Sequence, residues 1–427
     1  MNCSARRLLL WGGIIPLAIA GALAFAWTRV VPSDAELTER IRAQAEARLG
    51  VEVTVGAAHL RLWPGPELVI EDAGTSQPQP IRIKRMVTQP RLGALLQGRL
   101  ELADVEVDGA VLPQRSLGAL RMRPAPQGQE ATALQVAQVR FRDAIWITRN
   151  GTALEFEGRA RFDSGWRLRD AELVRPGVRP VARIALTPDG QDRWQVDLQV
   201  GGGTANGHVT LRAGKDGAMT LSGDLAPRNI DVAGALTAFK RHAAVNGKAS
   251  GQTRIAAEGT NVGELARSLH TRTSFSVAAA TLQHIDVDKA IRSFGNDRAG
   301  QTPLRSLTGQ MDTQNTADGI VVHYTGIQAK GETFTAKGQG TIANRRIDGE
   351  LTVDLAGGLV GVPLKVSGPL SQPQVTVARG AVAGATTGAV VGTLLLPGIG
   401  TAIGAGVGAA VGKLFGDSDT RKPVATR

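Results

Sequence analysis

Cysteine and aromatic residues are scarce in this chain, and each shortage limits what the protein can be. Cys3 is the single cysteine among the 427 residues, so no disulfide can form within the chain and the fold depends on burial and backbone pairing. Aromatic residues make up only 4% of the sequence. Because nucleic-acid bases stack on aromatic side chains, this shortage argues against a nucleic-acid partner despite the net charge of +11. Lys and Arg are spread among Asp and Glu, which is typical of a solvated surface; attraction to anionic lipid head groups is the functional alternative.

Sequence signatures of catalysis and metal binding are also missing. There is no G-x-S-x-G elbow and no P-loop, and the histidines do not occur at an H-x-x-x-H spacing. His284 lies close to Asp286 and Asp288, but strand alternation would place all three on one polar face. We therefore predict that the protein is not an enzyme, with no catalytic residue, no metal and no cofactor.

An uncharged apolar stretch, Leu8–Trp27, follows Arg6 and Arg7 near the start of the chain. About 20 apolar residues are what a helix needs to cross the hydrocarbon core of a bilayer. Inside lipid the backbone must bond to itself, so we expect a transmembrane helix despite Pro16. The two arginines favour a cytoplasmic N-terminus. The predicted anchor side chains are Leu8, Leu9, Leu10, Trp11, Ile14, Ile15, Leu17, Ile19, Leu23, Phe25 and Trp27.

A cleaved signal peptide is the alternative for this stretch, because Ala24-Phe25-Ala26 has the small-x-small pattern of a cleavage site. We expect a retained anchor, since the run is longer than the usual signal-peptide core of about 7–15 residues. Both interpretations export the rest of the chain. The predicted location is the inner membrane of a Gram-negative cell, single-pass, with the bulk in the periplasm.

Beyond a short helix that begins at a Ser33/Glu36 capping box and ends at Gly50, apolar and polar residues alternate with a period of two. This pattern is typical of strands with one buried face. It occurs at 51–55, 59–63, 67–71, 99–109, 139–143, 154–158, 194–200, 208–212 and 350–355. The candidate residues for an apolar, lipid-facing groove are Val51, Val53, Val55, Trp194, Val196, Leu198, Val200, Leu351, Val353 and Leu355.

Asp-Gly and Asn-Gly pairs are frequent between these segments, and both residues tolerate the positive φ of a hairpin turn. They predict a long antiparallel meander with few short helices, and they argue against parallel strand pairs. The pairs lie at 108–109, 150–151, 189–190, 206–207, 216–217, 246–247, 318–319 and 348–349. The predicted fold class is mainly β, an elongated and curled antiparallel sheet.

Glycines four residues apart dominate the C-terminal part of the chain. This spacing places them on one helix face, where two helices can approach closely, and Pro397-Gly398 supplies a turn. We predict a glycine-zipper helical hairpin that inserts into a membrane tip first; a Gly/Ala-rich tail without this structure is the alternative. The predicted packing positions are Gly380, Gly384, Gly388, Gly392, Gly400, Gly404, Gly408 and Gly412.

The predicted domain organisation follows these composition shifts. Residues 1–30 form the anchor, 31–121 an N-terminal β region with its leading helix, and 122–130 a linker rich in Pro and Gln. Residues 131–377 form the longer β-groove, 378–416 the glycine-zipper hairpin and 417–427 a polar tail.

Three stretches together resemble the AsmA family, relatives of TamB and of the bridge-like lipid transfer proteins. The first includes LRLWPGPELVIEDA and LGALLQGRLELADVEVDGAVL after the anchor and helix. The second is VAAATLQHIDVDKAIRSF with GQTPLRSLTGQM, and the third is FTAKGQGTIANRRIDGELTVDL with GVPLKVSGPLSQPQV. The resemblance implies an inner-membrane anchor, a periplasmic β-groove, and roles in outer-membrane integrity and phospholipid passage. It implies no catalytic residue.

The leading hypothesis is therefore non-enzymatic transfer of phospholipids between the envelope membranes. Its partners are phospholipids, the inner membrane, the outer membrane through the hairpin, and envelope proteins. The alternative is a scaffold or assembly factor for outer-membrane β-barrel proteins, because exposed sheet edges can pair with partner strands. The sequence leaves open whether the apolar face is an open groove or a closed core.

Overall fold

The computed structural model describes most of the chain between Ser33 and Val377. The predicted anchor, the 122–130 linker, the glycine-zipper hairpin and the polar tail lie outside the described residues, and they remain predictions. Within 33–377 the residues left undescribed are 62, 64, 91–100, 120–134, 149–150, 164–167, 215–217, 261, 294–295, 298, 317–318, 357–360 and 371–372.

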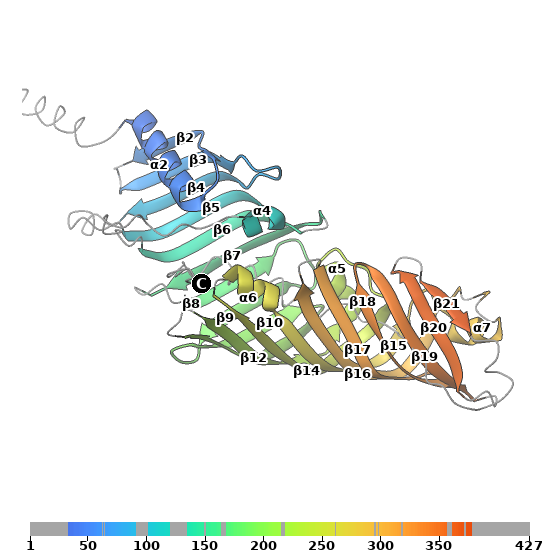
Figure 1. Cartoon of the computed structure of the whole chain (residues 1–427). Helices are drawn as coiled ribbons and strands as arrows, with labels where there is room; N and C mark the ends of the chain where they lie inside the picture. Colours follow the sequence, from blue (N-terminus) through green and yellow to red (C-terminus); the bar gives the residue numbers. More distant parts are fainter. Residues whose placement is uncertain are drawn as a thin grey trace, which may run out of the picture.

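The described strands form one sheet of 21 strands (Figure 1). The strands are β1 (Val53–Thr54), β2 (Ala57–Arg61), β3 (Glu67–Thr75), β4 (Arg82–Pro90), β5 (Glu101–Pro113), β6 (Gln135–Ile147), β7 (Ala153–Phe162), β8 (Leu168–Arg175), β9 (Ala182–Pro188), β10 (Arg193–Val200), β11 (Gly203–Ala213), β12 (Met219–Arg228), β13 (Ile230–Asp231), β14 (Val245–Gly259), β15 (His270–Leu282), β16 (Thr302–Thr316), β17 (Gly319–Lys330), β18 (Phe334–Ala343), β19 (Arg346–Leu355), β20 (Val362–Pro369) and β21 (Gln374–Val377).

The prediction of a mainly β, curled antiparallel sheet is confirmed, with one exception. Most strands pair with their sequence neighbours; the short β1 and β2 both pair with β3, and β12 and the short β13 both pair with β14. Among the described residues β21 forms no pair with β1 or β2, so the curled sheet has two edges. The exception is β5 and β6, which pair in parallel. A parallel pair requires the chain to return to the same end of the sheet. That return includes a short helix, α4 (Gln114–Ala119), which the sequence pattern did not predict.

Half of the predicted hairpin turns lie inside strands, and there the prediction was wrong. The pairs at 108–109, 206–207, 246–247 and 348–349 belong to β5, β11, β14 and β19. Gly207 shows one physical reason: a Cβ at this position would meet the backbone of Asp224 on β12, so the close approach of the two strands requires glycine. A turn that the pattern missed joins β18 to β19 through Asn344 and Arg345, both at positive φ.

Helix α2 (Asp34–Leu49) confirms the predicted helix and covers one edge of the sheet. The Ser33 hydroxyl accepts a hydrogen bond from the Glu36 amide at 3.3 Å, and the helix ends at Gly50 with φ 66°. On the edge strands, the Ala58 amide donates to the Thr38 hydroxyl at 2.9 Å, and the Val53 amide donates to the Glu46 carboxylate at 3.1 Å. Side chains of α2 therefore occupy backbone donors that would otherwise be free to pair with another chain.

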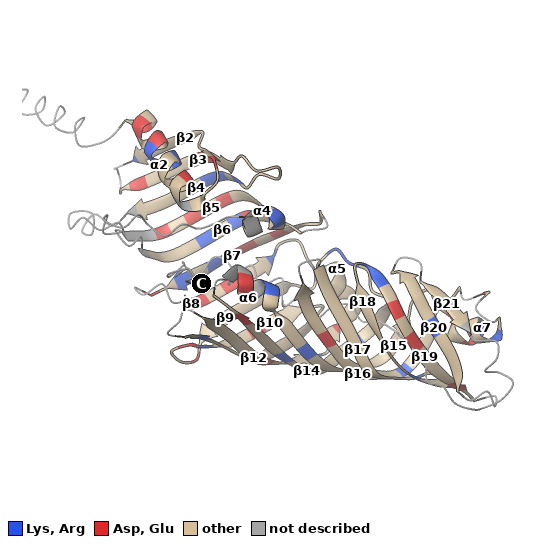
Figure 2. Ribbon diagram, viewed as in Figure 1, with Lys and Arg blue, Asp and Glu red and all other residues tan. Residues whose placement is uncertain are grey.

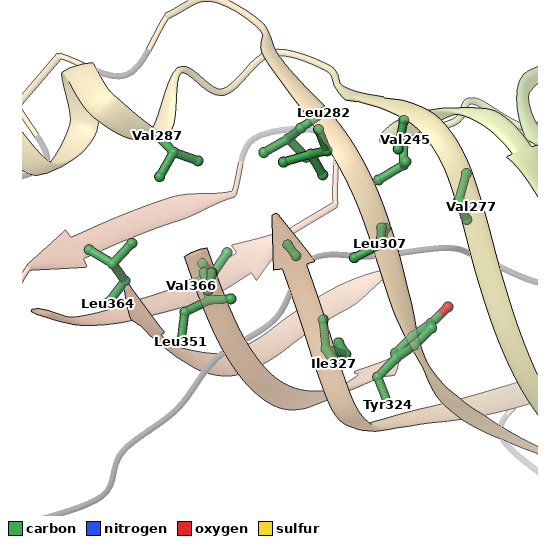
Figure 3. Close-up of a cluster of buried hydrophobic side chains, with 14 of the residues drawn as sticks. Val245, Val277, Leu282, Val287, Leu307, Tyr324, Ile327, Leu351, Leu364 and Val366 are labelled. Carbon is green, nitrogen blue, oxygen red and sulfur yellow. The ribbon is translucent and has the colours of Figure 1, made fainter. Parts of the chain in front are cut away.

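Three further short helices connect strands and bury apolar side chains under the sheet. They are α5 (Val232–Thr237), α6 (Val262–Ser268) and α7 (Val287–Arg292), in agreement with the few short helices that the sequence predicts. Val232 and Leu236 of α5 and Ile291 of α7 pack into the largest hydrophobic cluster, which includes residues of β14–β21. Figure 3 shows part of this cluster, with Leu307, Leu351 and Val366 converging from different strands. A second cluster lies over β7–β14, and a small third one lies over β4–β6.

A crease crosses the N-terminal strands and is made by residues with positive φ. Asp72 in β3, Gly109 in β5 and Asp143 in β6 have φ values of 51°, 67° and 51°. The strand registers place all three on one line across the sheet. Residues three apart in a regular strand point to opposite faces of the sheet. The crease shifts this in–out alternation by one residue, so that Val107 and Ala110 pack on the same face.

Valine at position 143 is expected to destabilise the protein by about 1–2 kcal/mol, because a β-branched L-residue is strained at positive φ. Asn tolerates this conformation, so Asp143→Asn serves as the matched control and should stay within about 0.5 kcal/mol of the wild type. Urea unfolding of both variants measures the difference. Equal stabilities for Asp143→Val and Asp143→Asn would show that the crease is not strained.

Candidate functional site

The predicted groove residues that belong to strands lie on the face of the sheet that carries the hydrophobic clusters, which we call the inner face; Val51 and Val55 lie outside the strands. The strand β10 residues Trp194, Val196, Leu198 and Val200 are between 1% and 7% exposed. Among the remaining candidates, Val53, Leu351, Val353 and Leu355 are also buried, whereas Val51 and Val55 are half-buried. The alternation identified the correct face. Whether this face binds lipid stays a prediction.

From β9 to β21 the inner face is covered by the protein's own side chains. Val245, Leu307 and Val353 are 0% exposed. The rings of Phe275 and Tyr324 meet edge to face, with their centroids 6.4 Å apart and an interplanar angle of 80°. A Cβ at Gly309 would lie 2.9 Å from Cζ of Phe275. Packing at this density leaves no space for an acyl chain, so β9–β21 form a closed core.

From β2 to β8 the inner face differs, because half-buried apolar side chains occur there among buried ones such as Ile70, Ala110 and Leu154. The strand registers and the third hydrophobic cluster assign these side chains to the same face. We call this set the apolar strip. It consists of Leu60, Leu68, Ala73, Ile83, Met86, Val107, Val139, Phe141, Trp146, Ala160, Ala171 and Leu173. An apolar surface that water can reach is available to an apolar ligand.

Charged residues of both signs are interspersed along β3–β7 (Figure 2), and the strand registers place those of β5 and β6 on the opposite, outer face. Arg140 on β6 pairs with Asp104 and with Glu106 on β5, the latter at 2.6 Å, and Arg142 pairs with Asp108 at 3.2 Å. The parallel register brings these acids and arginines opposite one another. The N-terminal part of the sheet is therefore amphipathic, with a polar outer face and an apolar strip inside.

Glu172 on β8 has the best-paired carboxylate of this outer face. It accepts hydrogen bonds from Nε of Arg183 at 2.6 Å and from Nε of Arg159 at 3.2 Å. The Arg183 guanidinium lowers the pKa of Glu172 below its ordinary value. Partial burial opposes this effect, and Arg159 adds to it. A carboxyl whose pKa is lowered by folding stabilises the folded state above the unfolded pKa, and this contribution is lost as the pH falls through the folded pKa.

Glu172→Gln is therefore expected to be less stable than the wild type at neutral pH. This difference should disappear as the pH falls below about 4.3, where the wild type loses the same contribution. The effect should be smaller than about 1 kcal/mol, since water screens the pair: the side chain of Glu172 is 25% exposed and that of Arg183 is 34% exposed. Denaturant unfolding at pH 7 and at acidic pH measures it. The control is Glu332→Gln, whose pair with Arg305 is 4.0 Å long and exposed; the same pH dependence in both variants would contradict the assignment.

Arg175, at the end of β8, is a charged residue on the inner face that sequence reasoning missed. It is 7% exposed, and its guanidinium lies 5.2 Å from the ring centroid of Phe156 and 5.9 Å from that of Phe239. Burial lowers the pKa of Arg175, an effect opposed by Glu155. The signal was available: Leu173 is an inward position, so strand alternation directs Arg175 to the same side.

Two searches within the described ranges were negative. No helix there has both the length and the apolarity needed to cross a membrane. No group of three potential metal ligands occurs in the part of the chain that the structure describes.

Comparison with known proteins gives one match, at the C-terminal end. A family model for a glycine zipper (Gly-zipper Omp) matches residues 379–422, which are 44 of the 427 residues. No curated protein and no solved structure matches the chain. The match supports the predicted glycine zipper, and its helical hairpin form stays a prediction. Because the match covers about a tenth of the chain, the resemblance to the AsmA family also stays a proposal.

Proposed function

We propose that this protein is a non-enzymatic lipid-transfer protein that holds acyl chains on the apolar strip of β2–β8. The observation that carries the proposal is the contrast along one inner face, which includes a set of half-buried apolar side chains over β2–β8 but is closed over β9–β21. Each methylene group removed from water stabilises the bound lipid by about 0.8 kcal/mol. Transfer needs no bond to be made or broken, so the proposal requires no catalytic residue.

The proposed setting is the envelope of a Gram-negative cell. The uncharged Leu8–Trp27 stretch would hold the chain in the inner membrane, and the glycine-zipper segment would contact a second membrane. The strip begins soon after α2, so in this arrangement it would lie near the inner membrane and receive lipid there. Passage beyond β8 would require the closed core to separate, or a partner protein to continue the path toward the outer membrane.

Native mass spectrometry of the full-length protein in a mild detergent tests the proposal. We expect phospholipid to remain bound, and we expect the delipidated protein to take up a fluorescent phospholipid from vesicles. Absence of both bound lipid and uptake would contradict it.

A scaffold for outer-membrane β-barrel proteins is the second candidate, and the unequal edges of the sheet favour it. Side chains of α2 cover β1 and β2, whereas no described strand pairs with the far side of β21. Such an edge can accept a partner strand. Crosslinks from β21 to barrel precursors, without any bound lipid, would favour this candidate over lipid transfer.

A further inference from the structure

Arg175 occupies an unusual position, at the boundary between the apolar strip and the closed core. It directly follows Val174 at the end of β8 and stands beside Phe156, which belongs to none of the three hydrophobic clusters. The strip lies toward β2, and the second hydrophobic cluster, which includes Phe162 of β7 and Leu168 of β8, continues through Ala182 and Ile184 of β9. A charge placed here is next to an apolar surface on one side and a packed core on the other.

The hydrogen-bonding capacity of Arg175 is incompletely used. Neither Nε nor Nη1 has a hydrogen-bond partner among the described residues, although both atoms are buried. A guanidinium stays protonated under physiological conditions, so the charge is present. The faces of Phe156 and Phe239 offset only part of the cost of burying it. An unpaired buried charge destabilises the free protein, and an anion that accepts a hydrogen bond from Nε or from Nη1 would offset part of this cost.

We propose that Arg175 binds the anionic head, a carboxylate or a phosphate, of an amphiphile whose tail lies on the apolar strip. This inference rests on the proposed function and adds the chemistry of the head group. Nε and Nη1 donate on opposite sides of the guanidinium, so the head would accept a hydrogen bond at one of them, and carboxylates and phosphates both offer charged oxygen atoms for this. The low-dielectric surroundings strengthen this pair relative to the same pair in water.

The dimensions fit such a ligand. Arg175 on β8 and Ile83 on β4 are separated by four strand spacings, which is about 19 Å. One leaflet of the hydrocarbon core, and hence one acyl chain, is about 15 Å long. The strand registers place Phe156, Ala144 and Ala110 directly between these two residues, and all three are buried. The tail would therefore lie beside this line, on the half-buried side chains of Phe141 and Val107.

The Phe239 ring lies against the guanidinium of Arg175, with its centroid 5.9 Å from Cζ. Phe239 directly follows Ala238, the residue that ends α5, and it is half-buried, whereas Phe156 is fixed within β7. We expect rotation of the Phe239 ring to expose the guanidinium without disturbing a strand, because Phe239 belongs to none. Phe239→Ala should therefore increase the affinity for an anionic amphiphile while Arg175 stays in place.

Equilibrium dialysis of the delipidated full-length protein tests the inference with probes that share one tail length: laurate, dodecyl phosphate and dodecanol. We expect the wild type to bind laurate and dodecyl phosphate at least ten times more tightly than dodecanol. Arg175→Met should abolish this preference and leave the affinity for dodecanol unchanged. The variant should fold, because it removes a charge with two unpaired nitrogens. Arg175→Lys should retain part of the preference.

The results separate the inference from the proposed function. Equal affinities of the wild type for laurate and dodecanol would overturn the role of Arg175 and leave lipid binding intact. Failure of every amphiphile to bind would overturn both. Inorganic phosphate that binds as tightly as dodecyl phosphate would show an anion site without a lipid, which also contradicts the inference. Because the comparison of laurate with dodecanol uses the wild type, it remains decisive even if a variant fails to fold.

Discussion

Leu307→Ala is expected to lower the free energy of unfolding by about 2–5 kcal/mol. Leu307 is 0% exposed on β16, in the largest hydrophobic cluster. Its neighbours belong to regular strands on both sides, β15 and β17, which cannot collapse freely into the space that alanine leaves. Urea unfolding with a two-state fit measures the change.

A leucine near the edge of the same sheet provides the matched control. Leu370 directly follows β20 and is 36% exposed, so Leu370→Ala should change the stability by less than about 0.5–1 kcal/mol. Similar losses for Leu307→Ala and Leu370→Ala would contradict the closed core of β9–β21. A lipid-filled core would behave differently again, since Leu307→Ala would then gain stability when lipid is added.

Val107→Lys is expected to reduce the bound phospholipid at least tenfold. Val107 lies in the middle of the apolar strip on β5, opposite Met86 of β4 and beside Phe141 of β6. A lysine there would face the acyl chain, and each 1.4 kcal/mol of lost binding energy reduces the affinity about tenfold. Native mass spectrometry and vesicle uptake measure the loss.

Val87→Lys is the control, because Val87 is also half-buried and lies on the neighbouring strand but on the outer face. Its register partner is Glu106, which offers the new lysine an opposite charge. We expect Val87→Lys to bind lipid as the wild type does. If Val107→Lys also retained its lipid, the apolar strip would not be the binding surface.

Alternation of apolar and polar residues predicted the strands and the inner face well. In β10 each candidate from Trp194 to Val200 is buried as expected, because a strand with one covered face permits only that arrangement. The capping box at Ser33 and the glycine at position 50 likewise predicted both ends of α2 correctly. Cap residues bond to the adjacent turn of the helix, so their effect does not depend on distant contacts.

Other features depend on contacts that one strand does not encode. An Asp-Gly or Asn-Gly pair predicts a turn only where the glycine is needed for its positive φ. At Gly207 glycine is needed instead because a neighbouring strand approaches too closely for a Cβ. The parallel pairing of β5 with β6 is set by a connection of more than a dozen residues, so short-range turn signals could not predict it. The degree of burial could not be predicted from the sequence either, because apolar and polar residues alternate in the same way in the closed core and in the apolar strip.

Photocrosslinking tests the central claim most directly. The full-length protein would be loaded with a phospholipid that carries a diazirine in its acyl chain, irradiated, digested and analysed by mass spectrometry. We predict that labelled peptides contain strip residues such as Met86, Val107 and Phe141, and that peptides with Leu307 or Val353 stay unlabelled. Labelling spread evenly from β3 to β20, or labelling that avoids the apolar strip, would contradict the account.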